Sequence, residues 1–428
     1  MRNRTLRRPR HVAFVSPAWP PDCLANGIVT YVANMRQGLQ QEGVSSLVLA
    51  WVPPDAPQNT PDVVPLCDAN IQAVPAALLR TVRRVSPWSL TGHQHALRVL
   101  HALQRLPGTS RPELIEMEES FGTPFWAQPF LDIPIVVRLH GPWFLAGPSD
   151  NVVQDAAFAR RVWAEGQAFR AALAITSPAR DQLERVRARY QVELPHAAVI
   201  PNPGPSVEAR ERWSYQACDK KTLLCVGRFD LRKGADLVVK AFRRLGAELP
   251  ELELLLVGPG EGIPVRGELL APERYLDGEL PGELRARARW LGSRPLSEIA
   301  ELRRRSFVTV VASRYENHPL AVLEALAYGC PLVASRTGGI PEIVQEGRNG
   351  VLFQSESEAD LAEACLRLLR DPQHAQRMGA EGARAMQNDY SPRAVARLTL
   401  DYYTERLERW HRMSASARLA FRLRTLVD

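Results

Sequence analysis

Short apolar segments alternate with longer amphipathic ones along most of the chain. In the first half, five apolar runs predict buried strands, and three stretches with apolar residues every three or four positions predict helices. The strands are expected at 12–16, 46–51, 114–117, 135–139 and 172–176, and the helices at 28–41, 155–170 and 181–190. Helices that alternate with buried strands are typical of a parallel, doubly wound sheet, so we expect an α/β fold.

The same alternation begins again after a segment rich in proline and glycine at 201–219. Strands are expected at 222–226, 252–257, 307–312 and 331–334, and helices at 234–245, 320–328 and 358–369. Because proline and glycine interrupt both kinds of element, this segment is expected to link two domains. We place the first domain at 1–205, the linker at 206–221, the second domain at 222–390, and a C-terminal helix with a basic tail at 391–428. We expect that tail to return to the first domain, and a ligand to bind between the domains at the carboxyl ends of the strands.

Composition and charge add an anionic partner to this picture. The 428 residues are 45% hydrophobic and 24% charged, which is ordinary for a globular protein of two to three domains. The net charge of +7 favours a nucleic acid, a phospholipid surface or a phosphorylated small molecule. The sequence has no zinc-finger, RNP or basic-zipper pattern, and we therefore expect no nucleic acid partner.

The sequence also argues against a metal site and against a membrane-spanning segment. The six cysteines are scattered without a Cys-x-x-Cys pair, and His93 and His95 have no acid or cysteine nearby in sequence. The arginine-rich start is followed by an apolar run of only four residues, 12–15, which is too short for a signal peptide. No run approaches the roughly 18 apolar residues that span a bilayer. We expect a soluble, cytoplasmic chain without a metal.

Two cations stand at the start of the first helix in the second half. Arg228 follows a predicted buried strand, and Lys233 lies just before the helix that begins near Gly234. A helix N-terminus favours an anion, so these side chains are candidates for a diphosphate site. A solvated surface turn is an equally good interpretation of this pattern taken alone.

A second group of candidates surrounds the helix at 320–328. Glu316 lies in the loop before the helix, and Pro319 suits its first turn. The free N–H groups of Leu320 and Ala321 could bind an anion, and the Glu324 side chain would reach back toward it. The two acids could therefore hold different parts of a phosphorylated sugar.

Gly27 and His140 are the candidates in the first half. Asn26-Gly27 precedes the first helix, but no Gly-x-Gly-x-x-Gly follows the first strand, which argues against a nicotinamide dehydrogenase. His140 follows the strand at 135–139 and precedes Gly141-Pro142, at the edge of the sheet where a ligand is expected.

These motifs, in this order, resemble those of family 4 of the retaining glycosyltransferases, which have the GT-B fold. The resemblance covers roughly 222–370 and is looser in the first half. It rests on Val226-Gly227-Arg228 with Lys233-Gly234, Leu256-Val257-Gly258-Pro259-Gly260, the segment from Glu316 to Gly329, and Gly338-Gly339-Ile340-Pro341-Glu342. The resemblance implies two Rossmann-like doubly wound domains that face each other across a cleft, the first for the acceptor and the second for a nucleotide sugar.

The resemblance also implies a role for each candidate residue. Arg228 and Lys233 would hold the donor diphosphate and stabilise it as the leaving group, and Glu316 would contact the sugar hydroxyls. In the same way, His140 would contact the donor sugar near the reacting carbon, Glu324 the ribose, and Arg294 the base. Leu320 and Ala321 would bind sugar and phosphates, and Gly27 would bind the diphosphate. No Asp-x-Asp motif occurs, so the implied reaction needs no metal and no cofactor beyond the donor itself.

The acceptor and the membrane are the least defined part of the prediction. The segment 76–106 mixes apolar residues with Trp88 and five arginines, and the tail has arginines at 406, 409, 412, 418, 422 and 424. Core helices with solvated arginines and a surface that lies on anionic lipid both fit this pattern. We expect a hexosyltransferase that acts on a glycan or lipid-linked acceptor in surface polysaccharide or glycoconjugate synthesis, peripheral to the inner face of the membrane.

Two alternatives stay open at this point, and a third, a phosphorylase, does not fit the sequence. A sugar-nucleotide epimerase of the same fold would use similar motifs. A phosphorylase would need a lysine late in the chain for pyridoxal phosphate, and no lysine follows Lys240. An inactive nucleotide-sugar-binding partner of another transferase is disfavoured, because the four central side chains (Arg228, Lys233, Glu316 and Glu324) are all present.

Overall fold

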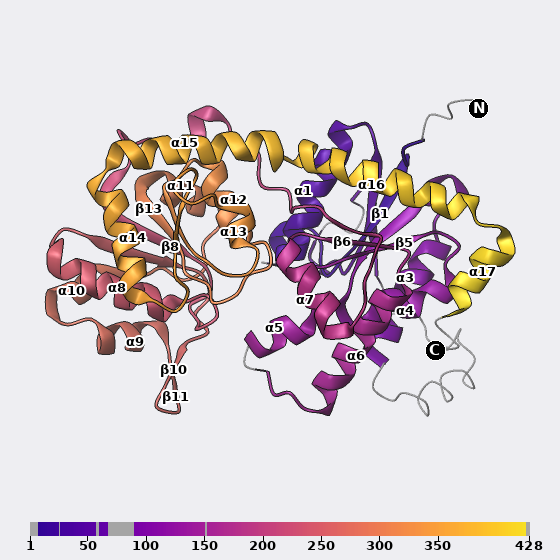
Figure 1. The fold of residues 1–428 in the computed structure, drawn as a ribbon, viewed down its shortest axis with the longest axis horizontal. Helices are drawn as coiled ribbons and strands as arrows, with labels where there is room; N and C mark the ends of the chain where they lie inside the picture. The colour runs from indigo at the N-terminus through magenta and orange to yellow at the C-terminus, as the bar shows by residue number, and fades with distance from the viewer. Residues whose placement is uncertain (1–6, 25, 57–59, 67–89, 150–151, 425–428) are drawn as a thin grey trace. The chain divides into compact units, whose positions relative to one another are not determined.

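The computed structural model describes residues 7–24, 26–56, 60–66, 90–149 and 152–424, which divide into two compact units. The first unit comprises residues 1–201 and 392–428, and the second comprises residues 202–391. Figure 1 shows helices packed on both sides of a sheet in each unit. The expected α/β architecture with two parallel sheets is confirmed.

The first unit is built on a seven-stranded parallel sheet with the order β3-β2-β1-β4-β5-β6-β7. The strands are β1 (His11–Ser16), β2 (Ser45–Ala50), β3 (Val63–Pro65), β4 (Leu114–Glu118), β5 (Ile135–Arg138), β6 (Ala174–Ser177) and β7 (Ala197–Val199). The helices are α1 (Gly27–Gln41), α3 (Leu90–Gln104), α4 (Thr123–Ala127), α5 (Trp143–Ser149), α6 (Ala156–Ala171), α7 (Arg180–Tyr190), α16 (Pro392–Arg412) and α17 (Ala415–Leu423). Apolar clusters cover both faces of the sheet, which explains why its strands are continuous apolar runs.

Helix α16 belongs to the first unit although it is nearly two hundred residues distant in sequence. A Cβ atom at Gly38 of α1 would lie 2.0 Å from the Pro392 carbonyl oxygen, so glycine permits the close contact of α1 and α16. The Tyr403 hydroxyl of α16 donates to Glu116 Oε2 of β4 at 2.5 Å, and the Tyr31 hydroxyl donates to Oε1 at 2.8 Å. These hydrogen bonds satisfy a fully buried carboxyl group.

The second unit is built on a six-stranded parallel sheet with the order β12-β9-β8-β13-β14-β15. The strands are β8 (Asp219–Val226), β9 (Glu253–Val257), β12 (Ala288–Trp290), β13 (Ser306–Val311), β14 (Leu332–Ser335) and β15 (Val351–Phe353), with a separate hairpin of β10 (Ile263–Val265) and β11 (Glu268–Leu270). The helices are α8 (Ala235–Glu248), α9 (Pro272–Glu279), α10 (Gly282–Ala286), α11 (Leu296–Arg305), α12 (Leu320–Ala327), α13 (Ile340–Ile343), α14 (Glu358–Arg370) and α15 (Pro372–Asp389). The long strand β8 pairs with β13, which is buried along its whole length.

The segment expected as a linker, 206–221, lies in the second unit. Trp213 is only 7% exposed, and its Nε1 donates to the Ser306 carbonyl oxygen at 2.8 Å. Its ring stacks on Phe307, with 6.1 Å between the ring centroids. The ring of Tyr215, in the same segment, also contacts Phe307, and the second unit begins at Asn202.

Two earlier expectations concern the membrane. No helix in the described ranges combines the length and the apolar character needed to cross a bilayer. Trp88 and three of the arginines between 76 and 89 lie outside the described residues.

Candidate functional site

The loop between β8 and α8, residues 227–234, holds both predicted cations. Arg228 Nε lies 3.0 Å from Asp230 Oδ2, and the backbone N–H of Lys233 donates to Asp230 Oδ1 at 2.6 Å. One carboxylate therefore fixes the side chain of the first cation and the backbone of the second. Gly234 ends the loop at a φ of +70°, and a Cβ atom there would lie 1.9 Å from the Ala312 carbonyl oxygen. Only glycine lets α8 begin this close to the end of β13.

Glu316 follows β13 and meets Lys233 directly. The Lys233 ammonium forms an ion pair with Glu316 Oε1, and the Ser313 hydroxyl donates to the same oxygen at 2.8 Å. Glu316 is 8% exposed. Burial alone would raise the pKa of this carboxyl group, but Lys233 and Arg232 more than offset it, so its pKa lies below the usual value. The structure thus places an ionised acid and a cation side by side.

The glycine pair at 338–339 supports the backbone of Glu316. The Gly339 N–H donates to the Glu316 carbonyl oxygen at 2.9 Å. Gly338 has a φ of +51°, and a Cβ atom there would lie 2.0 Å from that oxygen. This close approach explains why the Gly-Gly motif stands beside the acid.

Helix α12 begins at Leu320 with Pro319 as its N-cap residue and no side-chain cap. The N–H groups of Leu320 and Ala321 have no intrahelical acceptor and carry the positive end of the helix dipole. Glu324 lies one turn further, where Arg303 Nη2 donates to its Oε2 at 2.7 Å. Arg303 is 1% exposed, so it fixes Glu324 from inside the protein. Sequence reasoning missed Arg303 as well as Asp230 and Ser313.

The remaining predicted residues do not join the Lys233–Glu316 pair. Arg294 is exposed and lies 3.6 Å from Glu298 at the start of α11. Within the described part of the chain, no hydrogen bond or ion pair connects Arg294 or Glu324 with Lys233 or Glu316. The structure therefore brings Lys233 and Glu316 together, and Asp230 connects Arg228 to the same loop. The roles predicted for Arg294 and Glu324 stay predictions.

Gly27 and His140 lie in the first unit. Gly27 is the exposed first residue of α1, and the Asn26 side chain caps this helix by accepting the Ile28 N–H at 2.8 Å. The partly buried His140 ring packs edge-on against Tyr31, with 4.9 Å between the ring centroids. Burial and the nearby Arg138 guanidinium hold the pKa of His140 well below its usual value, so its imidazole is neutral at pH 7.

Glu119 is a further residue beside His140 that sequence reasoning missed. Its carboxyl oxygens accept the His140 N–H at 3.0 Å and the Gly141 N–H at 2.7 Å. Burial, with the nearby Glu165 and Glu118 carboxyl groups, raises the pKa of Glu119 to about 8. Acids at the carboxyl end of a predicted buried strand were the available signal.

Replacement of Glu119 by glutamine should flatten the dependence of stability on pH. Because the folded-state pKa of Glu119 lies above its unfolded value, the folded protein binds more protons between about pH 4.5 and pH 8. The free energy of unfolding therefore falls as the pH rises through this window, by at most about 1.4 kcal/mol per pH unit for one group. Urea unfolding of wild type and Glu119→Gln at pH 5 to 8 measures the difference in slope.

The control for this comparison is Glu193→Gln, which changes an exposed acid of the same unit. His140 has a lowered pKa and acts with the opposite sign below pH 6.5, but it is present in all three proteins, so its effect cancels. Equal slopes in wild type and Glu119→Gln would contradict the prediction.

The described residues contain no group of three or more histidine, cysteine, aspartate and glutamate side chains that could hold a metal ion. The cations of the 227–234 loop and the N-terminus of α12 are positive groups of this site.

Two family models match the chain. The model described as Glycosyltransferase Family 4 matches residues 25–203, and the model described as Glycosyl transferases group 1 matches residues 208–385. The two matches fall almost entirely into the first and the second unit, respectively.

Among curated relatives, the chain is similar to a D-inositol 3-phosphate glycosyltransferase of Thermobispora bispora, with 33% identity over 240 residues. That match covers 53% of this chain and 55% of the relative, so it spans about half the length of that protein. A glycogen synthase of Mycobacterium tuberculosis is 26% identical over 412 residues, which cover 92% of this chain and 94% of the relative.

Solved structures show the same fold. Sucrose-phosphate synthase from Thermosynechococcus elongatus superposes with a TM-score of 0.69 at 21% identity, and covers 92% of this chain and 98% of that one. Anabaena HepE in complex with UDP superposes with a TM-score of 0.64 at 16% identity, and covers 92% and 100%. The fold shared with these structures is GT-B, with two Rossmann-like units.

Proposed function

The chain belongs to glycosyltransferase family 4, also called glycosyl transferases group 1, and from this premise we propose the details of its reaction. As a glycosyltransferase, it transfers a sugar from a nucleotide sugar. We propose that the sugar is a hexose, that its anomeric configuration is retained, and that the acceptor is a glycan or a lipid-linked glycan of surface polysaccharide or glycoconjugate synthesis.

The observation that carries this proposal is the contact of Lys233 with Glu316 beside the start of α12. Both predicted cations are held by internal carboxylates, Lys233 by Glu316 and Arg228 by Asp230. A diphosphate that binds the loop would gain two positioned cations and the free N–H groups of α12. Once Lys233 also contacts a phosphate, the Glu316 carboxylate would accept hydrogen bonds from sugar hydroxyls.

In the proposed reaction, the bond between the anomeric carbon and the diphosphate oxygen breaks while the acceptor hydroxyl bonds to the same face of that carbon. The leaving phosphate takes the hydroxyl proton, so atoms and charge balance without a covalent intermediate. Arg228, Lys233 and the α12 N-terminus would stabilise the negative charge that develops on the diphosphate. The neutral imidazole of His140 would contact the donor sugar, and Gly27 the diphosphate.

We propose UDP as the nucleotide of the donor. Structures of Anabaena HepE, which has this fold, contain UDP or UDP-glucose. Glu324, fixed by Arg303, would accept hydrogen bonds from the ribose hydroxyls, and Arg294 would lie beside the base.

A membrane role is proposed for α17. Leu419 and Leu423 are exposed on this helix, which also carries Arg418 and Arg422.

Thermal unfolding with UDP, ADP, GDP and their hexose conjugates tests the donor. At 100 times its dissociation constant, the cognate nucleotide should add about 2.7 kcal/mol to the free energy of unfolding. We expect UDP to stabilise wild type and not Arg228→Gln. Arg243→Gln, which removes an exposed arginine of α8 outside the loop, is the matched control. If no nucleotide stabilises the protein, or if Arg228→Gln responds like wild type, the proposal is wrong.

A further inference from the structure

A cavity of about 470 Å³ lies in the first unit, far in sequence from the 227–234 loop. Its lining residues are Thr91, Gly92, Phe121, Trp143, Val152, Val153, Asp155, Ala157, Phe158, Arg160, Arg161, Trp163 and Ala164. This volume is typical of a small-ligand site. Phe121 follows β4 and Trp143 follows β5, so the cavity lies at the carboxyl edge of the sheet. Trp143 is three residues after His140 in the sequence.

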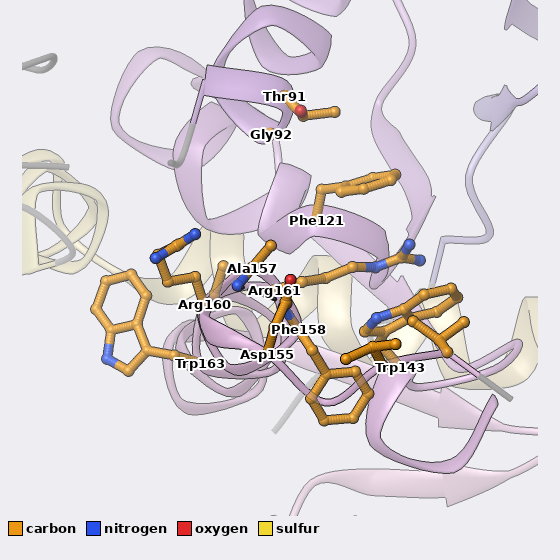
Figure 2. Close-up of a pocket in the computed structure, with 13 residues that line it drawn as sticks. Thr91, Gly92, Phe121, Trp143, Asp155, Ala157, Phe158, Arg160, Arg161 and Trp163 are labelled. Carbon is orange, nitrogen blue, oxygen red and sulfur yellow. Dashed lines mark hydrogen bonds between the residues drawn. The ribbon is translucent and has the colours of Figure 1, made fainter. Parts of the chain in front are cut away.

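Arg161 is held rigidly in this cavity. Figure 2 shows its side chain between Phe121 and Trp143, and its guanidinium carbon lies 3.9 Å and 3.7 Å from the centroids of those rings. Its Nε donates to Glu165 Oε1 at 3.1 Å, while Glu165 Oε2 accepts the Trp143 N–H at 2.6 Å. Glu165 is completely buried. Stacking and ion pairing thus fix the plane of the guanidinium before any ligand binds.

The terminal nitrogens of Arg161 remain available to a ligand. Among the described residues, its Nε alone is engaged in a hydrogen bond, to Glu165. Two parallel N–H donors on a fixed guanidinium match the oxygens of a phosphate. Arg160 adds a second positive charge to the lining. The acid in the lining, Asp155, is already used as the cap of α6, where it accepts the N–H groups of Ala157 and Phe158.

Two large apolar side chains of the cavity lining are exposed. Trp163 is 48% exposed and Val153 is 76% exposed, which marks them as candidates for contact with an apolar ligand group. Figure 2 shows the Trp163 ring directed away from the Arg161 guanidinium. A ligand that contacts both Arg161 and Trp163 needs an anionic group at one end and an apolar group at the other.

We propose that this cavity binds the acceptor through a phosphate group on Arg161, with an apolar part of the acceptor on Trp163 and Val153. The inference rests on the proposed function, because it assigns the acceptor of the same reaction. The phosphate can belong to a lipid-linked acceptor or to a soluble sugar phosphate, and the experiment distinguishes these sources.

The experiment is calorimetric titration of the full chain with three probes: octyl phosphate below its micellar concentration, octyl glucoside and glucose 1-phosphate. We expect octyl phosphate to bind, and octyl glucoside to bind at least tenfold more weakly because it lacks the charge. Arg161→Gln should weaken octyl phosphate at least tenfold. The control Arg170→Gln, which removes a charge from the same helix outside the cavity, should not change it. Trp163→Ser, at an exposed position, should weaken octyl phosphate and leave glucose 1-phosphate unchanged.

Arg161→Gln leaves the buried Glu165 without its cation, so Arg161→Lys and the double variant Arg161→Gln/Glu165→Gln serve as folded alternatives. Each lacks the planar pair of donors, and each should bind octyl phosphate as weakly as Arg161→Gln. If glucose 1-phosphate binds as tightly as octyl phosphate and depends on Arg161 in the same way, the site is supported. It is then assigned to a soluble sugar phosphate.

Octyl phosphate affinity that is the same in all Arg161 variants, or no binding of either phosphate, overturns the inference. UDP-dependent stabilisation should persist in the Arg161 variants, since Arg161 lies outside the 227–234 loop. A failure of UDP binding with intact octyl phosphate binding would therefore reject the proposed donor and leave this site in place.

Discussion

Lys233→Ala should lower the rate at which UDP-hexose is hydrolysed to UDP and hexose, with water as the acceptor and at saturating donor, by about three orders of magnitude. The ammonium group forms the ion pair with Glu316, which is nearly buried, and it is one of two cations proposed for the leaving diphosphate. Removal of a single positioned donor to a developing charge typically costs a factor of 10² to 10³. The variant additionally leaves Glu316 without its cation, which would raise the pKa of that acid. UDP release is measured by a coupled assay at fixed pH.

The control is Lys221→Ala, which removes an exposed lysine of the same unit that pairs with Glu251. Its rate should equal that of wild type. Lys233→Arg keeps the charge but changes its shape, and an intermediate rate is expected. A Lys233→Ala rate within threefold of wild type, with an unchanged circular dichroism spectrum, would show that Lys233 does not stabilise the leaving group.

Gly338→Ala should lower the same rate at least a hundredfold while the protein stays folded. The new Cβ atom would lie 2.0 Å from the Glu316 carbonyl oxygen, a separation that real Cβ contacts do not reach, so the loop that carries Glu316 must move. A displacement of the reacting groups by about 1 Å is enough to cost a factor of 10². The positive φ adds about 1 to 2 kcal/mol of strain for a residue with a side chain.

Gly347→Ala separates the displacement from the strain. Gly347 also has a positive φ, +73°, but a Cβ atom there meets nothing within 4 Å. Gly347→Ala should lose only the stability that the positive φ costs and keep its activity, whereas Gly338→Ala should lose activity and at least as much stability. Equal activity in the two variants would mean that the contact with Glu316 is unimportant for catalysis.

The sequence predicts the architecture well because the two sheets are parallel and buried on both faces. Such strands form continuous apolar runs, and the expected strand at 307–312 corresponds to β13 at Ser306–Val311. Helices with one apolar side are equally visible, and the expected helix at 28–41 corresponds to α1 at Gly27–Gln41. The sequence does not predict three-residue strands such as β3 and β15, because three residues are too few for an alternating pattern to appear.

Contacts between distant residues set the limit of sequence reasoning at the site. The motifs indicate Lys233 and Glu316 as separate candidates, and nothing in the local sequence shows that these residues, 83 positions apart, form an ion pair. Nothing in the local sequence shows that Arg303 reaches Glu324, or that Glu119 accepts the His140 N–H. The local sequence also does not show that Trp213 and Tyr215, in the segment expected as a linker, both contact Phe307 of the second unit.

The return of α16 to the first unit has a consequence for synthesis on the ribosome. The second unit is one uninterrupted stretch, so it is complete as soon as residue 391 has emerged, whereas the first unit, although started earlier, is finished later. Until Tyr403 arrives, Glu116 lacks one of its two hydroxyl partners and the β4 face beneath α16 stays uncovered. The nascent chain therefore passes through a stage with a finished second unit and an open first one, and that stage is where chaperones would engage it.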